Sequence, residues 1–173
     1  RRSILFDSRA SILVYGNGEK QIIEIADRLK EKKDLNGIKG TCIINKNCDE
    51  SFDILPSYQE VKNDAEQFCK MQLMLSNEKN LAQEYENNYL LQYKFPCYNT
   101  KDLAWIYSLP FTRKLHPNSL LKMAKFSIVT HRGCIGNCNF CSLPLHQGAN
   151  IISRSEKSIL EEIKKLTKQN QFY

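Results

Sequence analysis

The sequence predicts a partial α/β fold, because a strand pattern followed by a turn or loop and a helix pattern occurs near each end of the chain. Near the start, an apolar run is followed by a glycine turn and an amphipathic helical pattern. Near the end, a second apolar run leads into a cysteine-containing loop and another helical pattern. Between them lies a longer stretch of helical or irregular character. The chain has 173 residues, enough for one ordinary domain or for parts of two.

The composition is that of a globular protein. It is 42% hydrophobic and 25% charged, which excludes a disordered tail. Apolar runs reach only about five residues, whereas a membrane-spanning helix needs about 20, and no signal pattern follows Arg1 and Arg2. Seven cysteines is an odd number, so a disulfide framework is not favoured. We therefore expect a cytoplasmic protein with no membrane partner.

The first 48 residues predict a β-α-β unit. The run Ser11–Tyr15 predicts a strand, and Gly16-Asn17-Gly18 predicts a tight turn. Apolar residues then recur at helical spacing from Ile22 to Leu29, and Thr41–Asn45 predicts a second strand. Because β-α-β is the unit of a parallel sheet, we interpret residues 1–48 as the C-terminal part of an N-terminal α/β region.

Residues 49–122 show no clean sheet pattern, and we interpret them as a connector. Ser57 and Glu60 have the spacing of a capping box, which predicts a helix running to about Ser76. Residues 77–88 are polar and predict a loop or a loose helix.

Two more elements are predicted later in the connector. Tyr89–Tyr93 is expected to be extended. A short helix is expected to be capped by Thr100 and to stop before Pro110.

Residues 123–173 predict a strand, a long loop and a helix. Phe126–Thr130 gives the clearest strand signal of the chain. Ser153 and Glu156 have capping-box spacing and predict the start of the last helix. This order is that of the first βα unit of a parallel α/β fold.

The positive charge is concentrated in the second half of the chain. The net charge is +6, and no Asp or Glu lies between Asp102 and Glu156. The cations of this acid-free stretch are Arg113, Lys114, Lys122, Lys125, Arg132 and Arg154. We expect an anionic ligand there, and the alternative is chance clustering on a solvated face.

The long loop contains the spacing C-x3-C-x2-C at Cys134, Cys138 and Cys141. Three soft thiolates close together suit iron–sulfur or zinc chemistry. Gly133 and Gly136 allow the tight turns that bring the sulfurs together. A cubic cluster has four irons, so three cysteine ligands leave one iron open, whereas electron-transfer clusters are held by four cysteines.

Structural zinc is the competing interpretation. His131 supplies a fourth ligand in that case, which gives a closed tetrahedral site. The corresponding function is that of a zinc-stabilised, basic nucleic-acid-binding module. All the ligands then lie on one short loop, whereas structural zinc usually gains folding energy by joining separate segments.

The cysteine motif and its surroundings resemble the YgiQ-type group of the radical S-adenosylmethionine (SAM) superfamily. The residues that carry the resemblance are Thr130–Cys134, Asn139–Ser142, His146–Gly148, Ser153–Ser155, Tyr15–Glu19 and Leu109–Arg113. They span nearly the whole chain.

The resemblance implies a [4Fe–4S] cluster held by Cys134, Cys138 and Cys141, with SAM bound at the open iron. It also implies reductive cleavage of SAM to a 5′-deoxyadenosyl radical, and Phe140 near the adenine. Arg154 is a candidate for SAM's carboxylate or a substrate phosphate, because a guanidinium forks onto such groups, and the alternative is that it only lies at the start of a helix. The implied partners are a one-electron reductant such as flavodoxin or ferredoxin and an unidentified substrate, with RNA among the options.

The resemblance further implies that residues 123–173 begin a TIM-like radical SAM barrel. Residues 1–48 then correspond to a region similar to a cobalamin domain. The chain starts on Arg1 and ends on Tyr173 just after a helical pattern, so we interpret it as a fragment. We expect enzyme activity in the longer parent protein and not in the fragment alone, and the reaction type stays open.

Overall fold

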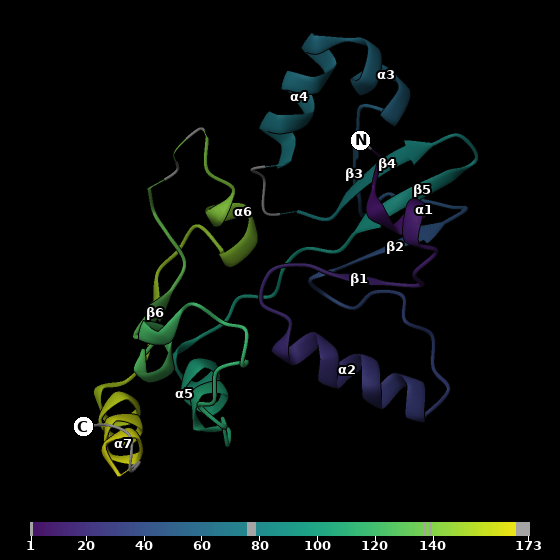
Figure 1. Ribbon diagram of the computed structural model, residues 1–173. Coiled ribbons are helices and arrows are strands. Elements are labelled where there is room, and N and C mark those ends of the chain that lie inside the picture. Colours follow the sequence, from purple (N-terminus) through teal and green to yellow (C-terminus); the bar gives the residue numbers. More distant parts are fainter. Residues whose placement is uncertain (1, 76–78, 137, 139, 169–173) are drawn as a thin grey trace. The chain divides into compact units, whose positions relative to one another are not determined.

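The computed structural model describes residues 2–75, 79–136, 138 and 140–168 (Figure 1). The chain divides into two compact units, Arg1–Pro96 and Cys97–Tyr173, and each is described here by itself. Both units combine helices and strands, which confirms the α/β character of the fold. Among the described residues, no helix is both long and apolar enough to cross a membrane.

The first unit is built around a five-stranded mixed sheet in the order β1-β2-β5-β4-β3. All neighbouring strands are antiparallel except β3 and β4, which are parallel. Its elements are α1 (Ile4–Ser8), β1 (Leu13–Val14), α2 (Glu19–Lys30), β2 (Thr41–Asn45), β3 (Asp53–Leu55), α3 (Tyr58–Asn63), α4 (Ala65–Leu75), β4 (Leu81–Tyr85) and β5 (Asn88–Gln92).

The predicted elements β1, α2 and β2 are present, but the predicted parallel pairing is wrong. Leu13 faces Cys42 and Val14 faces Thr41 in an antiparallel register. The chain turns into β2 through Gly37 and Gly40, whose φ angles are 79° and 77°. Only glycine adopts such angles readily, so these turns let the chain enter β2 in the opposite direction to β1.

Strands from the predicted connector complete this sheet. β5 pairs with β2 along Cys42 to Asn45, and β4 pairs with β5 on its other side. Ile43, Phe52, Ala82 and Leu91 are buried together in the core. Burying a side chain such as Ile43, Phe52 or Leu91 contributes about 1.5–3 kcal/mol, so this sheet face stabilises the unit.

The loop predicted over residues 77–88 is wrong where the structure describes it. Leu81–Tyr85 is β4, and its polar Gln83 is buried because its side-chain amide donates to the carbonyl oxygen of Pro56 at 3.0 Å. A buried polar group is tolerated when it is hydrogen-bonded in this way. Ser76, Asn77 and Glu78 lie outside the described residues.

The capping box at Ser57 is confirmed. The Ser57 hydroxyl accepts from the Glu60 N–H at 3.2 Å, and the Glu60 carboxylate accepts from the Ser57 N–H at 2.8 Å. The predicted single helix is divided into α3 and α4, because Asp64 adopts an extended conformation with φ −133° and ψ 119°.

The second unit contains α5 (Thr100–Ser108), the 3₁₀ helix η1 (Lys122–Phe126), β6 (His131–Arg132), α6 (Leu143–Gln147), β7 (Ile152–Ser153) and α7 (Glu156–Thr167). The helices predicted before Pro110 and after Ser153 are confirmed as α5 and α7. Their predicted caps are each displaced: Asn99 caps α5 in place of Thr100, and Ser155 caps α7 in place of Ser153.

The strand predicted at Phe126–Thr130 is wrong. Phe126 ends η1, and the paired residues are His131 and Arg132, which form an antiparallel ladder with β7. Within the residues that the structure describes, this unit has one two-stranded sheet and no closed barrel.

Candidate functional site

The cysteine loop (residues 133–151) is closed at its base by β6 and β7. His131 pairs with Ser153 and Arg132 pairs with Ile152. Just inside this ladder, the Cys134 N–H donates to the carbonyl oxygen of Gly148 at 3.2 Å. The two ends of the loop are therefore held together by main-chain hydrogen bonds, whatever the side chains of the loop bind.

Gly133 is required at the point where the chain enters the loop. Its φ angle is 95°, and a Cβ atom built there lies 2.0 Å from the carbonyl oxygen of Asn150. No side chain fits at that distance, so the two strands of the loop base approach each other closely only because residue 133 is glycine. The prediction that Gly133 permits a tight turn is confirmed.

Main-chain groups of the loop contact all of the motif's sulfurs. The Gly136 N–H donates to Cys134 Sγ at 3.3 Å, and the Leu143 N–H donates to Cys141 Sγ at 3.5 Å. Cys138 Sγ donates to the Gly136 carbonyl oxygen at 3.6 Å. N–H groups directed at sulfur are a regular feature of cysteine ligands in iron–sulfur sites.

Gly136 lies between two of these sulfurs. A Cβ atom built at Gly136 lies 3.3 Å from Cys134 Sγ and 3.6 Å from Cys138 Sγ. Cys138 is exposed, and Cys134 and Cys141 are half-buried, so the thiols are accessible to an incoming metal. The soft donor set suits a metal cluster.

The structure does not gather these thiols into a metal-binding group. Among the described residues, no cluster of three or more His, Cys, Asp or Glu side chains is close enough to hold a metal ion. Asn137 and Asn139 of the motif lie outside the described residues. The assignment of Cys134, Cys138 and Cys141 as ligands therefore stays a prediction.

The other predicted site residues of the loop lie at its base and on its surface. His131 is exposed in β6, and its Nδ1 atom lies 2.9 Å from the Thr130 hydroxyl. Phe140 is 93% exposed. The ring of Phe140 is therefore open to a ligand, whereas its contact with SAM stays a prediction.

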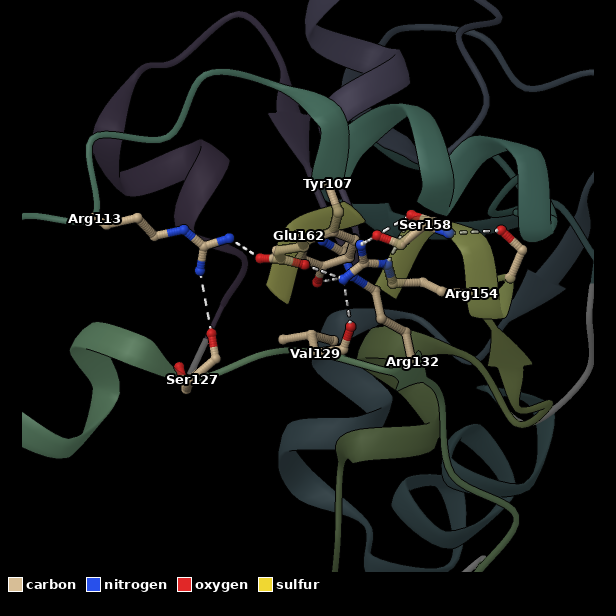
Figure 2. A network of polar contacts seen from close by, with 9 residues as sticks. Tyr107, Arg113, Ser127, Val129, Arg132, Arg154, Ser158 and Glu162 are labelled. Carbon is tan, nitrogen blue, oxygen red and sulfur yellow. Dashed lines mark hydrogen bonds and ion pairs between the residues drawn. The ribbon is translucent and has the colours of Figure 1, made fainter. Parts of the chain in front are cut away.

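Arg154 lies in a buried network behind the loop (Figure 2). Its guanidinium donates to the carbonyl oxygens of Val129 and Ser158, each at 2.9 Å, and forms an ion pair with Glu162. It also lies over the ring of Tyr107 at 4.5 Å from the centroid. Burial lowers the pKa of Arg154 from its ordinary value, and nearby Arg113 acts in the same direction while Tyr107 opposes them.

Arg113 binds the same carboxylate from the other side. Glu162 forms ion pairs with both Arg113 and Arg154, and Arg113 also donates to the Ser127 carbonyl oxygen at 3.1 Å (Figure 2). Two arginines thus hold the backbone of residues 127–129, which leads into β6 and the cysteine loop. Glu162 was absent from the sequence prediction. It is buried in α7, and its place in the sequence gives no sign of its two arginine partners.

Arg154 has partners within its own unit. Its side chain has no exposed surface in this structure. Its predicted role as a SAM contact stays a prediction without support from this geometry, and the structure shows its guanidinium holding the approach to the loop.

Comparison with known protein families decides where this chain belongs. The family model described as radical SAM N-terminal matches residues 1–130. The chain belongs to the radical SAM N-terminal family. The matched segment of this radical SAM N-terminal protein ends at Thr130, immediately before β6, and the cysteine loop begins after β6.

Curated relatives of this radical SAM N-terminal protein include UPF0313 proteins. It is 36% identical to one from Fusobacterium nucleatum, over 100% of this chain and 33% of the relative. It is 40% identical to one from Methanocaldococcus jannaschii, over 99% of this chain and 31% of the relative. The chain thus spans about a third of the length of these relatives. No solved structure gives a significant match.

These matches confirm the resemblance to the YgiQ-type group that the sequence predicted. The names of the relatives describe no activity.

Proposed function

We propose that this chain carries the cluster-binding segment of a radical SAM enzyme. Cys134, Cys138 and Cys141 hold a [4Fe–4S] cluster, and SAM binds at the iron that they leave free. The observation that carries the proposal is the position of the C-x3-C-x2-C motif, which starts at Cys134, shortly after the radical SAM N-terminal match ends at residue 130. A cluster reduced by one electron, with SAM bound, supplies a 5′-deoxyadenosyl radical.

The residues around the loop have separate tasks in this proposal. The Gly136 and Leu143 N–H groups stabilise the bound sulfurs of Cys134 and Cys141. The exposed ring of Phe140 provides an apolar face for the adenine.

The remaining parts of the proposal concern the whole protein. The electron comes from a reductant such as flavodoxin or ferredoxin. The cysteine loop lies at the start of a TIM-like barrel. The enzyme activity belongs to a longer parent protein, similar in length to the UPF0313 relatives. The family leaves the substrate and the reaction type open, and a cobalamin-domain-like role for residues 1–48 is likewise a hypothesis.

Anaerobic reconstitution with iron and sulfide tests the cluster. We expect close to four irons and four sulfides per chain, with visible absorbance that is bleached by reduction. The triple variant C134A/C138A/C141A should lose both. C48A/C69A/C97A is the matched control, because it removes the same number of thiols from cysteines that lie outside the motif.

Two results contradict the proposal. One is stoichiometric iron in the C134A/C138A/C141A protein. The other is a colourless wild-type protein with one zinc, lost on substitution of His131, which is the result expected of the zinc-stabilised nucleic-acid-binding module.

A further inference from the structure

The second unit has a basic groove in a place that the proposed function does not use. It has a volume of about 300 Å³ and lies between the segment after α5 and the end of η1. Among the residues that line it are Tyr107, Phe111, Arg113, Lys114 and Lys125. This volume is at the lower end of the range found for small-molecule binding sites, and ligands of nucleotide size bind in sites of that range.

The groove has an excess of positive charge. Arg113 and Lys114 come from one wall and Lys125 from the other, and none of the described lining residues is Asp or Glu. The carboxylate nearest in the network, Glu162, is buried and is shared between Arg113 and Arg154, so two cations face one anion. The groove therefore attracts anions more strongly than a surface with balanced charges.

The groove also has an available aromatic face. Phe111 is 49% exposed, and the Arg113 guanidinium lies 5.5 Å from its ring centroid. Tyr107 is half-buried and has two guanidinium groups against its ring, those of Arg132 and Arg154 at 5.2 and 4.5 Å from its centroid, whereas the exposed Phe111 has one. Phe111 is thus the ring on which a base can stack, with a cation beside it.

We propose that this groove binds a nucleotide unit, with its phosphate at Lys114 and Lys125 and its base on Phe111. Basic side chains that follow a phosphate backbone, combined with an aromatic platform, are the usual means of binding single-stranded nucleic acid without sequence preference. The bound nucleotide is either a free nucleotide or part of an RNA strand, and the experiment distinguishes the two. Binding does not depend on the cluster, whereas a role of the bound nucleotide as substrate rests on the proposed function.

Fluorescence anisotropy with the full chain tests the groove in the absence of iron and SAM. The probe is a fluorescein-labelled adenylate RNA of about ten nucleotides, titrated at salt concentrations from about 50 to 200 mM. For K114Q/K125Q, the slope of log K against log salt should fall by about 1.4, since each phosphate contact on a single strand contributes about 0.7. K164Q/K165Q in the last turn of α7 removes the same charge elsewhere and should keep the wild-type slope.

The base contact has its own variant. F111L keeps an apolar side chain but removes the ring, and it should weaken RNA binding by about fivefold or more. Unlabelled AMP that displaces the probe identifies a free nucleotide as sufficient. RNA binding that AMP does not displace identifies the strand as the ligand, and both results support the groove.

Three results overturn the proposal. They are no RNA or AMP binding by the wild type, equal slopes for K114Q/K125Q and K164Q/K165Q, and an F111L protein that binds like the wild type. The iron content of reconstituted K114Q/K125Q should stay at the wild-type value. A failure of the groove therefore leaves the cluster proposal intact, and the reverse is also true.

Discussion

Gly133 controls the shape of the cysteine loop through one close contact. Its φ of 95° is unfavourable for any residue with a side chain, and a Cβ atom there meets the Asn150 carbonyl oxygen at 2.0 Å. Gly148 has a similar φ of 98°, but nothing lies within 4 Å of its Cβ position. A side chain at either position would strain the backbone, but only a side chain at position 133 would also clash with a neighbouring atom.

G133A should therefore be more destabilising than G148A. Both variants are expected to lose about 1–3 kcal/mol from backbone strain, and G133A loses more because the loop base must open. Denaturant unfolding monitored by the single tryptophan, Trp105 of the second unit, measures the difference. Iron uptake on reconstitution should fall in G133A and be largely kept in G148A. Equal effects of the two substitutions contradict this account of Gly133.

Glu162 shares its carboxylate between the buried Arg154 and the half-buried Arg113. Its side chain is 5% exposed, and that of Arg154 has no exposed surface. Removing one partner of a buried ion pair leaves an uncompensated charge, and this costs far more than the intact pair contributes.

E162Q should lower the free energy of unfolding of the second unit by about 3 kcal/mol or more. The neighbouring Glu161 is exposed, so E161Q removes the same charge and should change stability by less than about 0.5 kcal/mol. Thermal unfolding of the two variants gives the comparison. If E162Q and E161Q melt together, the network in Figure 2 does not stabilise this unit.

The sequence predicted residues whose chemistry is local and missed those whose partners are distant. C-x3-C-x2-C is a spacing within one loop, and Gly133 adjoins it. Glu162 acts through Arg113 and Arg154, and a carboxylate in a helix pattern gives no sign of which cation it meets. For the same reason, Arg154 was interpreted as available to a ligand.

At the scale of elements, the longer helices were predicted because their signals are short-range, whereas the short helices α1 and α6 were missed. Apolar spacing and the Ser57 capping box identified α2 and α3, and similar patterns identified α5 and α7. Strands depend on what pairs with them. Phe126–Thr130 has a strand composition, but the carbonyl oxygens of Ser127 and Val129 accept from arginine side chains, and that of Thr130 accepts from the Arg154 N–H.

β4 is the opposite case, a strand that is present although its sequence did not predict it. Its sequence Leu81-Ala82-Gln83-Glu84-Tyr85 contains two polar residues and does not alternate cleanly. It forms a strand because β3 and β5 pair with its two edges and because the Pro56 carbonyl oxygen accepts from Gln83. β5 follows β4 directly in the chain, but β3 and Pro56 lie far before it, so half of the pairing that makes β4 a strand leaves no local signal.

The start of α7 allows the predicted and observed caps to be compared directly. Ser153 was predicted as the cap, whereas in the structure the Ser155 hydroxyl accepts from the Ser158 N–H at 3.3 Å. S155A should cost about 1 kcal/mol, and S153A, at an exposed position in β7, should be close to neutral. Urea unfolding of both variants measures the loss in the free energy of unfolding. A larger loss in S153A than in S155A would support Ser153 as the cap.

At the scale of the whole molecule, the two units differ in how their buried groups respond to alkali. Burial is the largest cause that raises the pKa of Tyr15, Cys42, Tyr85 and Tyr93, all in the first unit. For Cys42 it raises the pKa from 9.0 to about 12. The pKa of Cys42 is therefore higher in the folded chain than in the unfolded chain. The stability that this thiol contributes is complete below pH 9 and is lost as the pH rises toward 12.

The stability of the first unit should therefore fall between about pH 9 and 12, with Cys42 contributing up to about 1.4 kcal/mol per pH unit. C42A removes that thiol and should show a shallower loss over the same range, although it is less stable at neutral pH because Cys42 is buried in β2. Hydrogen exchange of β2 and β5 amides follows the first unit specifically, and Trp105 fluorescence follows the second. Parallel pH profiles for wild type and C42A would mean that the Cys42 thiol ionises in the folded chain as readily as in the unfolded one.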